Sequence, residues 1–329
     1  MLIERESEEL SFSQLALSRK EHRWNRHWLK KILNLVDWSK FDKLLKKPYS
    51  KKDGRHAWEP LFLFKCLLLQ QWYGMSDRQL EEALEFRIDF CKFAGFNFED
   101  NVPDATTFVK FRNRIKPVWN KLLIILNKQI EQAGFQIKKA VAVDATLVEA
   151  HSKPCGNKAS LDSDGSWRGF PAKKVKDKNG DTVLARRQAL FGYKINLSAT
   201  VKHGFVSDFS ICKASEHETH HLEEFIDRNK TRVVYADKGY VGNRSLLSEL
   251  KIADGIQAKG SRGKPLLDND ISRNKKITKS RRIVEGVFGG FKQWYGWRKT
   301  KYVGLSRNSL AVCLTALAWN MKKLALITG

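Results

Sequence analysis

The sequence predicts an α/β protein in which an all-α N-terminal domain precedes a mixed five-stranded sheet with helices on both faces. Up to about residue 134 the apolar residues recur with the period of a helix. From Lys138 onward, short β-branched runs alternate with helical segments, which is typical of a sheet covered on both faces. With 329 residues, 42% of them hydrophobic, the chain is long enough for two domains. We expect a helical domain over residues 1–135 and an α/β domain over residues 136–329.

Two consecutive helices are predicted late in the first domain. Ser76 and Gln79 form a capping box ahead of an apolar stripe, which comprises Leu80, Leu84 and Ile88. Further on, Pro103 and Asp104 open a second helix, whose expected buried stripe comprises Phe108, Phe111 and Ile115.

The second of these helices is basic. Arg112 and Arg114 lie on or near its remaining surface, where they are candidates for contacts with DNA phosphates. Two short helices joined by a turn are compatible with a helix-turn-helix-like reader of DNA. They are equally compatible with an ordinary helical bundle that has a solvated basic face.

The α/β domain is built from five expected strands. They lie at residues 138–150, at two segments within 191–215 joined by a turn at His203 and Gly204, at 232–237 and at 255–259. Helices are expected at residues 220–228, 243–252, 278–296 and 309–326. Residues 155–188 are polar and rich in Gly, Asp and Lys, which indicates an insertion between the first two strands.

Composition narrows the class of partner. Sixty Lys and Arg against 36 Asp and Glu give a formal net charge of +24, which favours a polyanion such as nucleic acid. No secretory signal is evident, and the apolar run at residues 61–69 is short and interrupted by Lys65, so we expect a cytoplasmic protein without a transmembrane helix. The five cysteines are scattered without CxxC spacing, which argues against a disulfide framework and against a zinc ribbon.

Two aspartates stand at expected strand ends. Asp144 lies in or at the end of the first strand, and Asp237 follows the fourth. Taken singly, each is ordinarily a turn residue. Together they suggest a site for a divalent cation, because a buried carboxylate needs a partner and carboxylate oxygens suit such ions.

A third acid, Glu285, lies on the helix expected over residues 278–296. Helical offsets of 4, 7 and 11 place four residues on one face, namely Arg281, Glu285, Phe288 and Lys292. An acid flanked by bases suits a metal ligand whose neighbours hold phosphate oxygens. The alternative is an ion pair between Arg281 and Glu285 on a wet surface, worth roughly a few tenths of a kcal/mol.

The order of these acids and the blocks around them resemble the DDE transposases of bacterial insertion sequences, in particular the insertion-sequence "five" group. The blocks are DATLVEAHS, FGYKINL, YADKGYVG and RRIVEGVFGGFKQWYGWRKTKYVGL, preceded by an InsH-like N-terminal block that begins WEPLFLFKC. Together they span roughly residues 55–325. The acids are separated by 93 residues (237 − 144) and by 48 residues (285 − 237).

This resemblance implies an RNase H-like catalytic domain, and a helical domain that binds DNA and dimerises. It implies that Asp144, Asp237 and Glu285 are catalytic and hold two Mg²⁺ or Mn²⁺ ions. Such an enzyme binds terminal inverted repeats, hydrolyses a phosphodiester bond at each end and joins the freed 3′-OH to target DNA. The implied partner is double-stranded DNA, bound by a homo-oligomer, and the implied location is the nucleoid in the cytoplasm.

Basic and aromatic residues of the last quarter are the expected DNA contacts. Residues 251–329 contain 17 Lys and Arg against 4 Asp and Glu, and the candidates are Arg281, Lys292, Arg298 and Lys299. The aromatic residues Trp294, Tyr295, Trp297 and Tyr302 either stack on an unpaired base or pack against the sheet, and packing is the stronger expectation. The signature of the related family, Tyr-x2-Arg-x3-Glu-x6-Lys, maps onto Arg281, Glu285 and Lys292, but Thr278 stands where that signature has its tyrosine. Gly289 and Gly290 predict a break or a close backbone approach in the helix.

Several residues and two other functions stay open. The histidines at 217, 220 and 221 indicate a polar loop entering a helix rather than a metal cluster, because no further Cys or acidic ligand follows at a fixed spacing. His151 is a candidate neighbour of the site, and Lys238 and Tyr240 are expected near DNA. A nuclease of the same fold without strand transfer would share the three acids, and a silent DNA-binding relative would have lost one.

Overall fold

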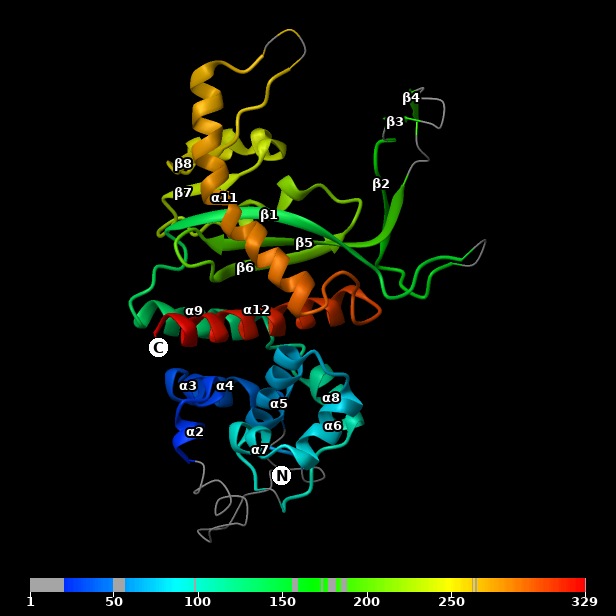
Figure 1. The fold of residues 1–329 in the computed structure, drawn as a ribbon, viewed down its shortest axis with the longest axis vertical. Helices are drawn as coiled ribbons and strands as arrows, with labels where there is room; N and C mark the ends of the chain where they lie inside the picture. The colour runs from blue at the N-terminus through cyan, green and yellow to red at the C-terminus, as the bar shows by residue number, and fades with distance from the viewer. Residues whose placement is uncertain are drawn as a thin grey trace. The chain divides into compact units, whose positions relative to one another are not determined.

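The structure is a computed structural model, which describes residues 21–49, 57–97, 99–155, 159–172, 174–176, 182–184, 188–261, 263 and 265–328. The chain divides into two compact units. The first combines Met1–Ile137 with Leu310–Gly329, and the second is Lys138–Ser309. Figure 1 shows the elements of both units along the chain.

The first unit is a bundle of helices. Its elements are α2 (Glu21–Asn25), α3 (Trp28–Leu35), α4 (Trp38–Leu45), α5 (Pro60–Tyr73), α6 (Asp77–Phe86), α7 (Ile88–Ala94), α8 (Ala105–Arg114), α9 (Asn120–Gln132) and most of α12 (Leu305–Ile327). Helix α5 is apolar all round and buried along most of its length, as expected of the central helix of a bundle.

The caps predicted for the two late helices are confirmed. Ser76 Oγ accepts from the backbone of Gln79 at 3.3 Å, and the Gln79 side chain accepts from the backbone of Ser76 at 2.9 Å. Asp104 caps α8 by accepting from the backbone of Thr107 at 2.6 Å. The expected stripes are buried, except that α6 ends at Phe86 and Ile88 begins the next helix.

Arg112 has an internal partner, which corrects its assignment as a phosphate contact. Its guanidinium is buried and forms a two-pronged ion pair with Asp77, whose first contact is 2.9 Å long. This pair joins α8 to α6. Arg114 is exposed and lies over the ring of Tyr49, 4.7 Å from its centroid, and it stays a predicted DNA contact.

The two arginines should therefore respond differently to truncation. Arg112→Ala leaves the partly buried carboxylate of Asp77 without its cationic partner, with Gln70 Nε2 as its remaining donor, and should lower the free energy of unfolding by about 3 kcal/mol. Arg114→Ala should change it by less than about 1 kcal/mol. Urea denaturation followed by tryptophan fluorescence measures both. Equal losses would contradict the structural role of Arg112.

The C-terminal helix belongs to a different compact unit than the expected division between the domains implied. Residues 310–329 group with the N-terminal helices, and not with the sheet as the division at 136–329 assumed. Three polar contacts fix α12 there: Trp72 Nε1 donates to Ala318 O at 2.8 Å, Thr315 Oγ1 contacts Gln71 Oε1 at 3.1 Å, and Asn320 Nδ2 donates to Asn127 Oδ1 at 3.0 Å. Helix α12 is also long and apolar enough to cross a membrane by composition, but 72% of its most apolar stretch is buried.

The second unit contains the mixed sheet. Its strands are β1 (Ala140–Glu149), β2 (Ser166–Gly169), β5 (Ala189–Thr200), β6 (Val206–Lys213), β7 (Val233–Ala236) and β8 (Ala253–Ile256), in the order β2-β5-β1-β7-β8 with β6 also paired to β5. Strand β5 pairs antiparallel with β1, β2 and β6, whereas β1, β7 and β8 are parallel. The α/β class is confirmed, and the expected five strands are all present.

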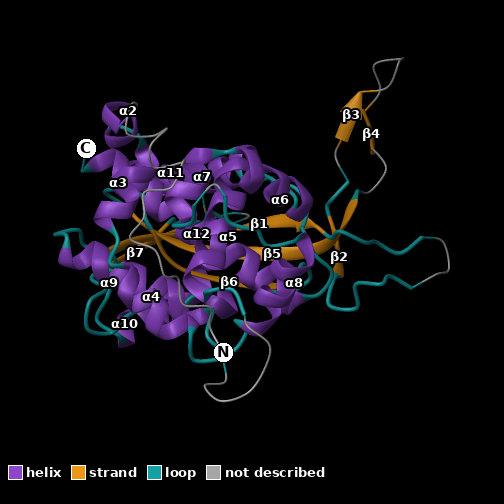
Figure 2. Cartoon of the chain, turned by 90° about the horizontal axis from the view of Figure 1, so that it is seen from below, coloured by secondary structure: helices purple, strands orange, loops and turns teal. Residues whose placement is uncertain are grey.

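The polar insertion adds structure that the sequence did not predict. It contributes β2 to the sheet, which therefore has six strands, and a separate hairpin of β3 (Lys174–Lys176) and β4 (Thr182–Leu184), seen outside the main sheet in Figure 2. Parts of the predicted insertion lie outside the described residues.

Two helix predictions are corrected. Residues 220–228 do not form an α-helix but two 3-10 turns, η1 (Glu218–His221) and η2 (Glu223–Phe225). The helix expected from residue 278 is α11 (Asp268–Trp294), which begins ten residues earlier and runs without a break through Gly289 and Gly290. A side-chain carbon at Gly289 would meet no atom within 4 Å, so no close approach explains that glycine.

The two faces of the sheet are covered differently. Val141 and Val143 of β1 belong to a buried core with residues of η2, of η3 (Lys238–Asn243) and of α10 (Arg244–Glu249). Helix α11 packs against β1, β5 and β7. Because side chains alternate along a strand, Ala142 and Asp144 point to the opposite face from these valines, toward α11.

Candidate active site

Parallel pairing brings Asp144 and Asp237 level with each other. Ala142 of β1 lies opposite Tyr235 of β7. Asp144 and Asp237 each come two residues later, so they reach the same height and the same face of the sheet, Asp144 in the middle of β1 and Asp237 just after the end of β7. Strand register thus places the two candidate metal ligands, Asp144 and Asp237, next to each other.

Asp237 also caps the turn that follows β7. Its Oδ1 accepts from the backbone N–H of Gly239 at 2.6 Å, at the start of η3. Tyr240 of this turn is buried, and its hydroxyl has no hydrogen-bond partner among the described residues. The turn is therefore fixed by the Asp237 cap and by the buried ring of Tyr240.

Helix α11 brings the third acid to the two aspartates. Arg281 Nη2 lies 3.4 Å from Asp144 Oδ2 and 3.9 Å from Glu285 Oε1. The Arg281 side chain is only 10% exposed, whereas Glu285 is 52% exposed. The ion pair with Glu285 proposed from helical spacing exists, but the closer partner of Arg281 is Asp144 on the neighbouring strand.

Thr278, which stands at the tyrosine position of the family signature, contacts Arg281 indirectly through Gln257. Thr278 Oγ1 accepts from Gln257 Nε2 at 2.9 Å, and Gln257 Oε1 accepts from Arg281 Nη1 at 3.3 Å. A chain of polar contacts thus runs from α11 through Gln257 to the guanidinium. The Nη1 and Nη2 donors of Arg281 therefore face Gln257 and the acids, and its role as a DNA contact stays a prediction.

Burial raises the pKa of Asp144 to about 6. Desolvation of the carboxylate is the largest cause, and the charges of Asp237 and Glu285 act in the same direction. The backbone N–H of Ala145 and the charge of Arg281 lower the pKa. The three carboxylates therefore repel one another, and a bound cation would relieve this repulsion.

The raised pKa predicts that Asp144→Asn stabilises the metal-free protein. An acid whose pKa is higher in the folded state adds stability below about pH 4, which is lost as the pH rises through about 6. In EDTA at about pH 7.5, the variant should gain on the order of 2–3 kcal/mol in free energy of unfolding, and the gain should vanish near pH 4. Urea denaturation at both pH values measures it, with Asp268→Asn at the exposed start of α11 as control. Destabilisation by Asp144→Asn at the higher pH would contradict the assigned burial.

A fourth carboxylate, Glu218 of η1, lies beside the site and was missed from the sequence. A side-chain carbon at Gly239 would lie 2.8 Å from Asp237 Oδ1 and 3.3 Å from Glu218 Oε1, so both oxygens flank the same turn. The Glu218 carboxylate is 3.4 Å from Nζ of Lys194, a buried lysine of β5 that also donates to Glu216 O. A lysine inside a predicted strand was the available signal, since a buried ammonium requires a carboxylate partner.

The other three basic residues predicted to contact DNA differ in burial: one is half-buried and two are exposed. Lys292 is half-buried, and its pKa is lowered mainly by burial and also by Arg298, while Asp144 raises it. Arg298 and Lys299 are exposed and are held beside the end of β1, where Arg298 O and Thr300 N bond to the backbone of Glu149 at 3.2 and 2.7 Å. These three bases keep their predicted role.

The aromatic residues separate by burial. Tyr295 and Trp297 are buried, as expected of residues that pack inside the protein, and Tyr302 is partly buried. Trp294 is 62% exposed and remains a stacking candidate. The side chain of His151 is exposed, and its backbone N–H donates to Thr300 Oγ1 at 2.8 Å.

Comparison with known proteins shows which family the chain belongs to. The family described as Transposase domain (DUF772) matches residues 17–114, and the family described as Transposase DDE domain matches residues 136–321. The transposase for insertion sequence element IS1106 of Neisseria meningitidis serogroup B is 30% identical over 225 residues, which is 66% of this chain and 77% of that protein. No solved structure matches the chain significantly. With more than half of its length matched by the catalytic-domain family, the chain belongs to the DDE transposases of insertion sequences.

Proposed function

We propose that this transposase binds the terminal inverted repeats of an insertion sequence, cleaves the ends by metal-dependent hydrolysis of a phosphodiester bond and joins the resulting 3′-OH to target DNA. One observation supports this most directly. Asp144 and Glu285 both lie within 4 Å of Nη2 of the buried Arg281, at 3.4 and 3.9 Å, and Asp237 is close enough to raise the pKa of Asp144.

The donor set of the site fits two Mg²⁺ or Mn²⁺ ions. Asp144, Asp237 and Glu285 offer hard carboxylate oxygens, which are the ligands that these ions prefer. The mutual repulsion of the three acids leaves negative charge to be neutralised. When bound, the ions activate the attacking water and stabilise charge on the attacking and leaving oxygens.

The other residues of the site orient the acids and hold DNA. Arg281 holds Asp144 and Glu285 in place, and Gln257 holds Arg281. Lys292, Arg298 and Lys299 are assigned to phosphates of the DNA backbone, so binding should weaken steeply with salt. Trp294 is assigned to an unpaired base at the cleaved end, because its ring is exposed on the same helix as Glu285.

The helical domain is assigned to DNA binding and dimerisation. Its exposed Arg114 is a candidate phosphate contact. A homo-oligomer assembled on DNA would bring the two ends of the element together, and the place of action would be the nucleoid in the cytoplasm.

The test is a reaction with a duplex that carries the inverted repeats flanking the gene, an acceptor plasmid and Mg²⁺. We expect cleavage at the repeat ends and covalent joining to the acceptor, both abolished by EDTA. Cleavage without joining would assign the chain to the nuclease class. Specific DNA binding without either reaction would make it a silent relative.

Glu218 and Lys194 should matter to this reaction as positioning residues. Glu218→Gln leaves the buried ammonium of Lys194 without its carboxylate, beside the turn that carries Asp237. We expect Mn²⁺ affinity to fall about tenfold to a hundredfold, as for other groups that orient metal ligands. Titration of Mn²⁺ followed by electron paramagnetic resonance measures it.

Two further variants separate positioning from a general loss of stability. Lys194→Met combined with Glu218→Gln removes both halves of the pair and should recover part of the Mn²⁺ affinity. Glu223→Gln, an exposed carboxylate paired with Arg228 on the surface, is the control. Wild-type affinity in Glu218→Gln would show that Glu218 does not position the turn.

A further inference from the structure

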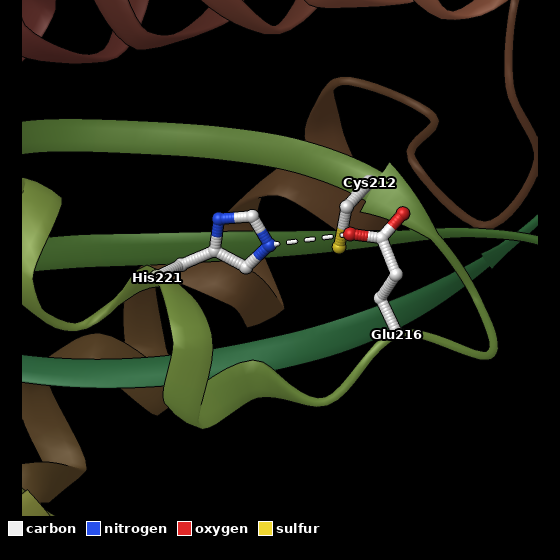
Figure 3. Close-up of side chains that lie close together, drawn as sticks. All are labelled: Cys212, Glu216 and His221. Carbon is white, nitrogen blue, oxygen red and sulfur yellow. Dashed lines mark ion pairs between the residues drawn. The ribbon is translucent and has the colours of Figure 1, made fainter.

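A second group of metal-ligating side chains lies at the end of β6 and in the segment that follows it. Cys212, Glu216 and His221 point toward one another, and one ligand atom from each lies within 4.8 Å of the others (Figure 3). His221 Nε2 is 3.7 Å from Glu216 Oε2. None of the three belongs to the acid site described above.

The imidazole of His221 is arranged to bind a ligand through Nε2. Its other nitrogen, Nδ1, lies 3.2 Å from Glu224 Oε1, which sets the ring orientation as carboxylates do for metal-binding histidines. Nε2 is buried and has no hydrogen-bond partner among the described residues. A buried nitrogen of this kind requires an unseen partner.

Cys212 supplies a donor from the rigid part of the sheet. It is buried in β6, and Asn196 Nδ2 of β5 lies 3.5 Å from its sulfur. Asn196 Oδ1 is also buried without a hydrogen-bond partner among the described residues. The amide nitrogen of Asn196 therefore faces the sulfur, and the unsatisfied Nε2 of His221 lies beside the carboxylate of Glu216.

We propose that Cys212, Glu216 and His221 bind one divalent ion of the zinc type, with a fourth position for water. A set of one sulfur, one nitrogen and one oxygen suits Zn²⁺ or Co²⁺, whereas Mg²⁺ and Ca²⁺ take oxygen ligands. On binding, the Cys212 S–H bond breaks, the proton passes to solvent and the sulfur bonds to the metal, so no oxidant or reductant is needed.

The ion would fasten η1 to β6, and η1 borders the catalytic turn. Glu218 of η1 flanks Gly239, and Asn243 Nδ2 at the end of η3 donates to Thr219 O at 3.0 Å. The proposed site is thus a structural metal centre that stiffens the segment next to Asp237, and it does not depend on the proposed transposition reaction.

The test uses the full-length protein, freed of metal and titrated with Co²⁺ in the presence of excess Mg²⁺. We expect one equivalent of Co²⁺ to bind and to produce a thiolate-to-cobalt charge-transfer absorption. Zn²⁺ should displace it, and binding should weaken as the pH falls, because the Cys212 thiol must lose its proton to bind the metal. Metal analysis of the protein purified with Zn²⁺ should give the same stoichiometry.

Variants locate the ion. Cys212→Ser should abolish the absorption, and Glu224→Gln should weaken binding about tenfold or more. Glu216 is 43% exposed, so Glu216→Gln should keep the fold while losing affinity at least about tenfold. Cys155→Ser, which removes an exposed thiol, and Asp237→Asn, in the acid site, should both leave Co²⁺ binding unchanged.

Three results would overturn the proposal: no Co²⁺ binding in excess Mg²⁺, an absorption that survives Cys212→Ser, or wild-type affinity in Glu216→Gln. Failure of the proposed transposition is distinguishable, because it would appear as absent DNA cleavage by a protein that still binds one Co²⁺.

Discussion

Asp144→Asn, Asp237→Asn and Glu285→Gln should each reduce DNA cleavage and joining by at least about a thousandfold. Each change keeps the shape of the side chain and replaces an anionic ligand oxygen with a neutral amide. Stabilisation of transition-state charge by metal ions amounts to several kcal/mol, and each 1.36 kcal/mol is about tenfold in rate. Rates on labelled transposon-end DNA in Mg²⁺ and in Mn²⁺ measure the loss.

The controls for this prediction separate chemistry from folding and binding. Asp268→Asn removes an exposed acid from the same helix as Glu285 and should react like wild type. All three acid variants should still bind DNA, because losing negative charge does not weaken contacts to phosphates. A variant that retains wild-type cleavage would remove its residue from the site.

Arg281→Met should give the second largest loss, about tenfold to a hundredfold in cleavage rate near neutral pH, as expected for a group that orients metal ligands. Arg281 lowers the pKa of Asp144 and is its closest cationic partner, at 3.4 Å. Without this charge, the pKa of Asp144 rises above its value of about 6. A larger fraction of Asp144 is then protonated, and the acidic limb of the pH–rate profile should move to higher pH.

A neighbouring arginine provides the matched control for this test. Arg282→Met changes an exposed residue of α11 and should leave the pH profile in place. If Arg281→Met instead weakened DNA binding and left the acidic limb unmoved, Arg281 would be a phosphate contact, as the helical spacing alone suggested.

Much of the fold was predictable because its signals are local. The capping box at Ser76, the cap at Asp104 and the β-branched runs of β1 and β7 each depend on neighbouring residues. Strand β2 has four residues and is a strand only because it pairs with β5, so it carried no local pattern of its own. Residues 220–228 have the composition of a helix, yet the chain forms 3-10 turns there, with Glu218 beside the turn of Asp237.

The partners of charged residues were not predictable, because they depend on contacts between distant segments. Arg112 and Arg281 both looked like surface bases on helices, but each lies buried against an aspartate, at positions 35 and 137 residues away respectively (112 − 77 and 281 − 144). The EHETHH segment contains no cysteine, and only the fold brings Cys212 of β6 close to His221. Spacing along a helix cannot distinguish an inward-facing arginine from an outward-facing one.

By itself, the sequence determined the α/β class, the basic charge and the order of three acids, two of them in or after strands and one on a late helix, because these features are periodicity, composition and position along the chain. The structure places Asp144 in the middle of β1 and not at its end. Only the tertiary structure decided that Asp144 is level with Asp237 and that Arg281 lies closer to Asp144 than to Glu285. It also decided that Glu218, paired with Lys194, lies beside the turn of Asp237, and that α12 packs with the N-terminal helices. These are outcomes of strand register and burial, which are set by pairings between segments far apart in the chain.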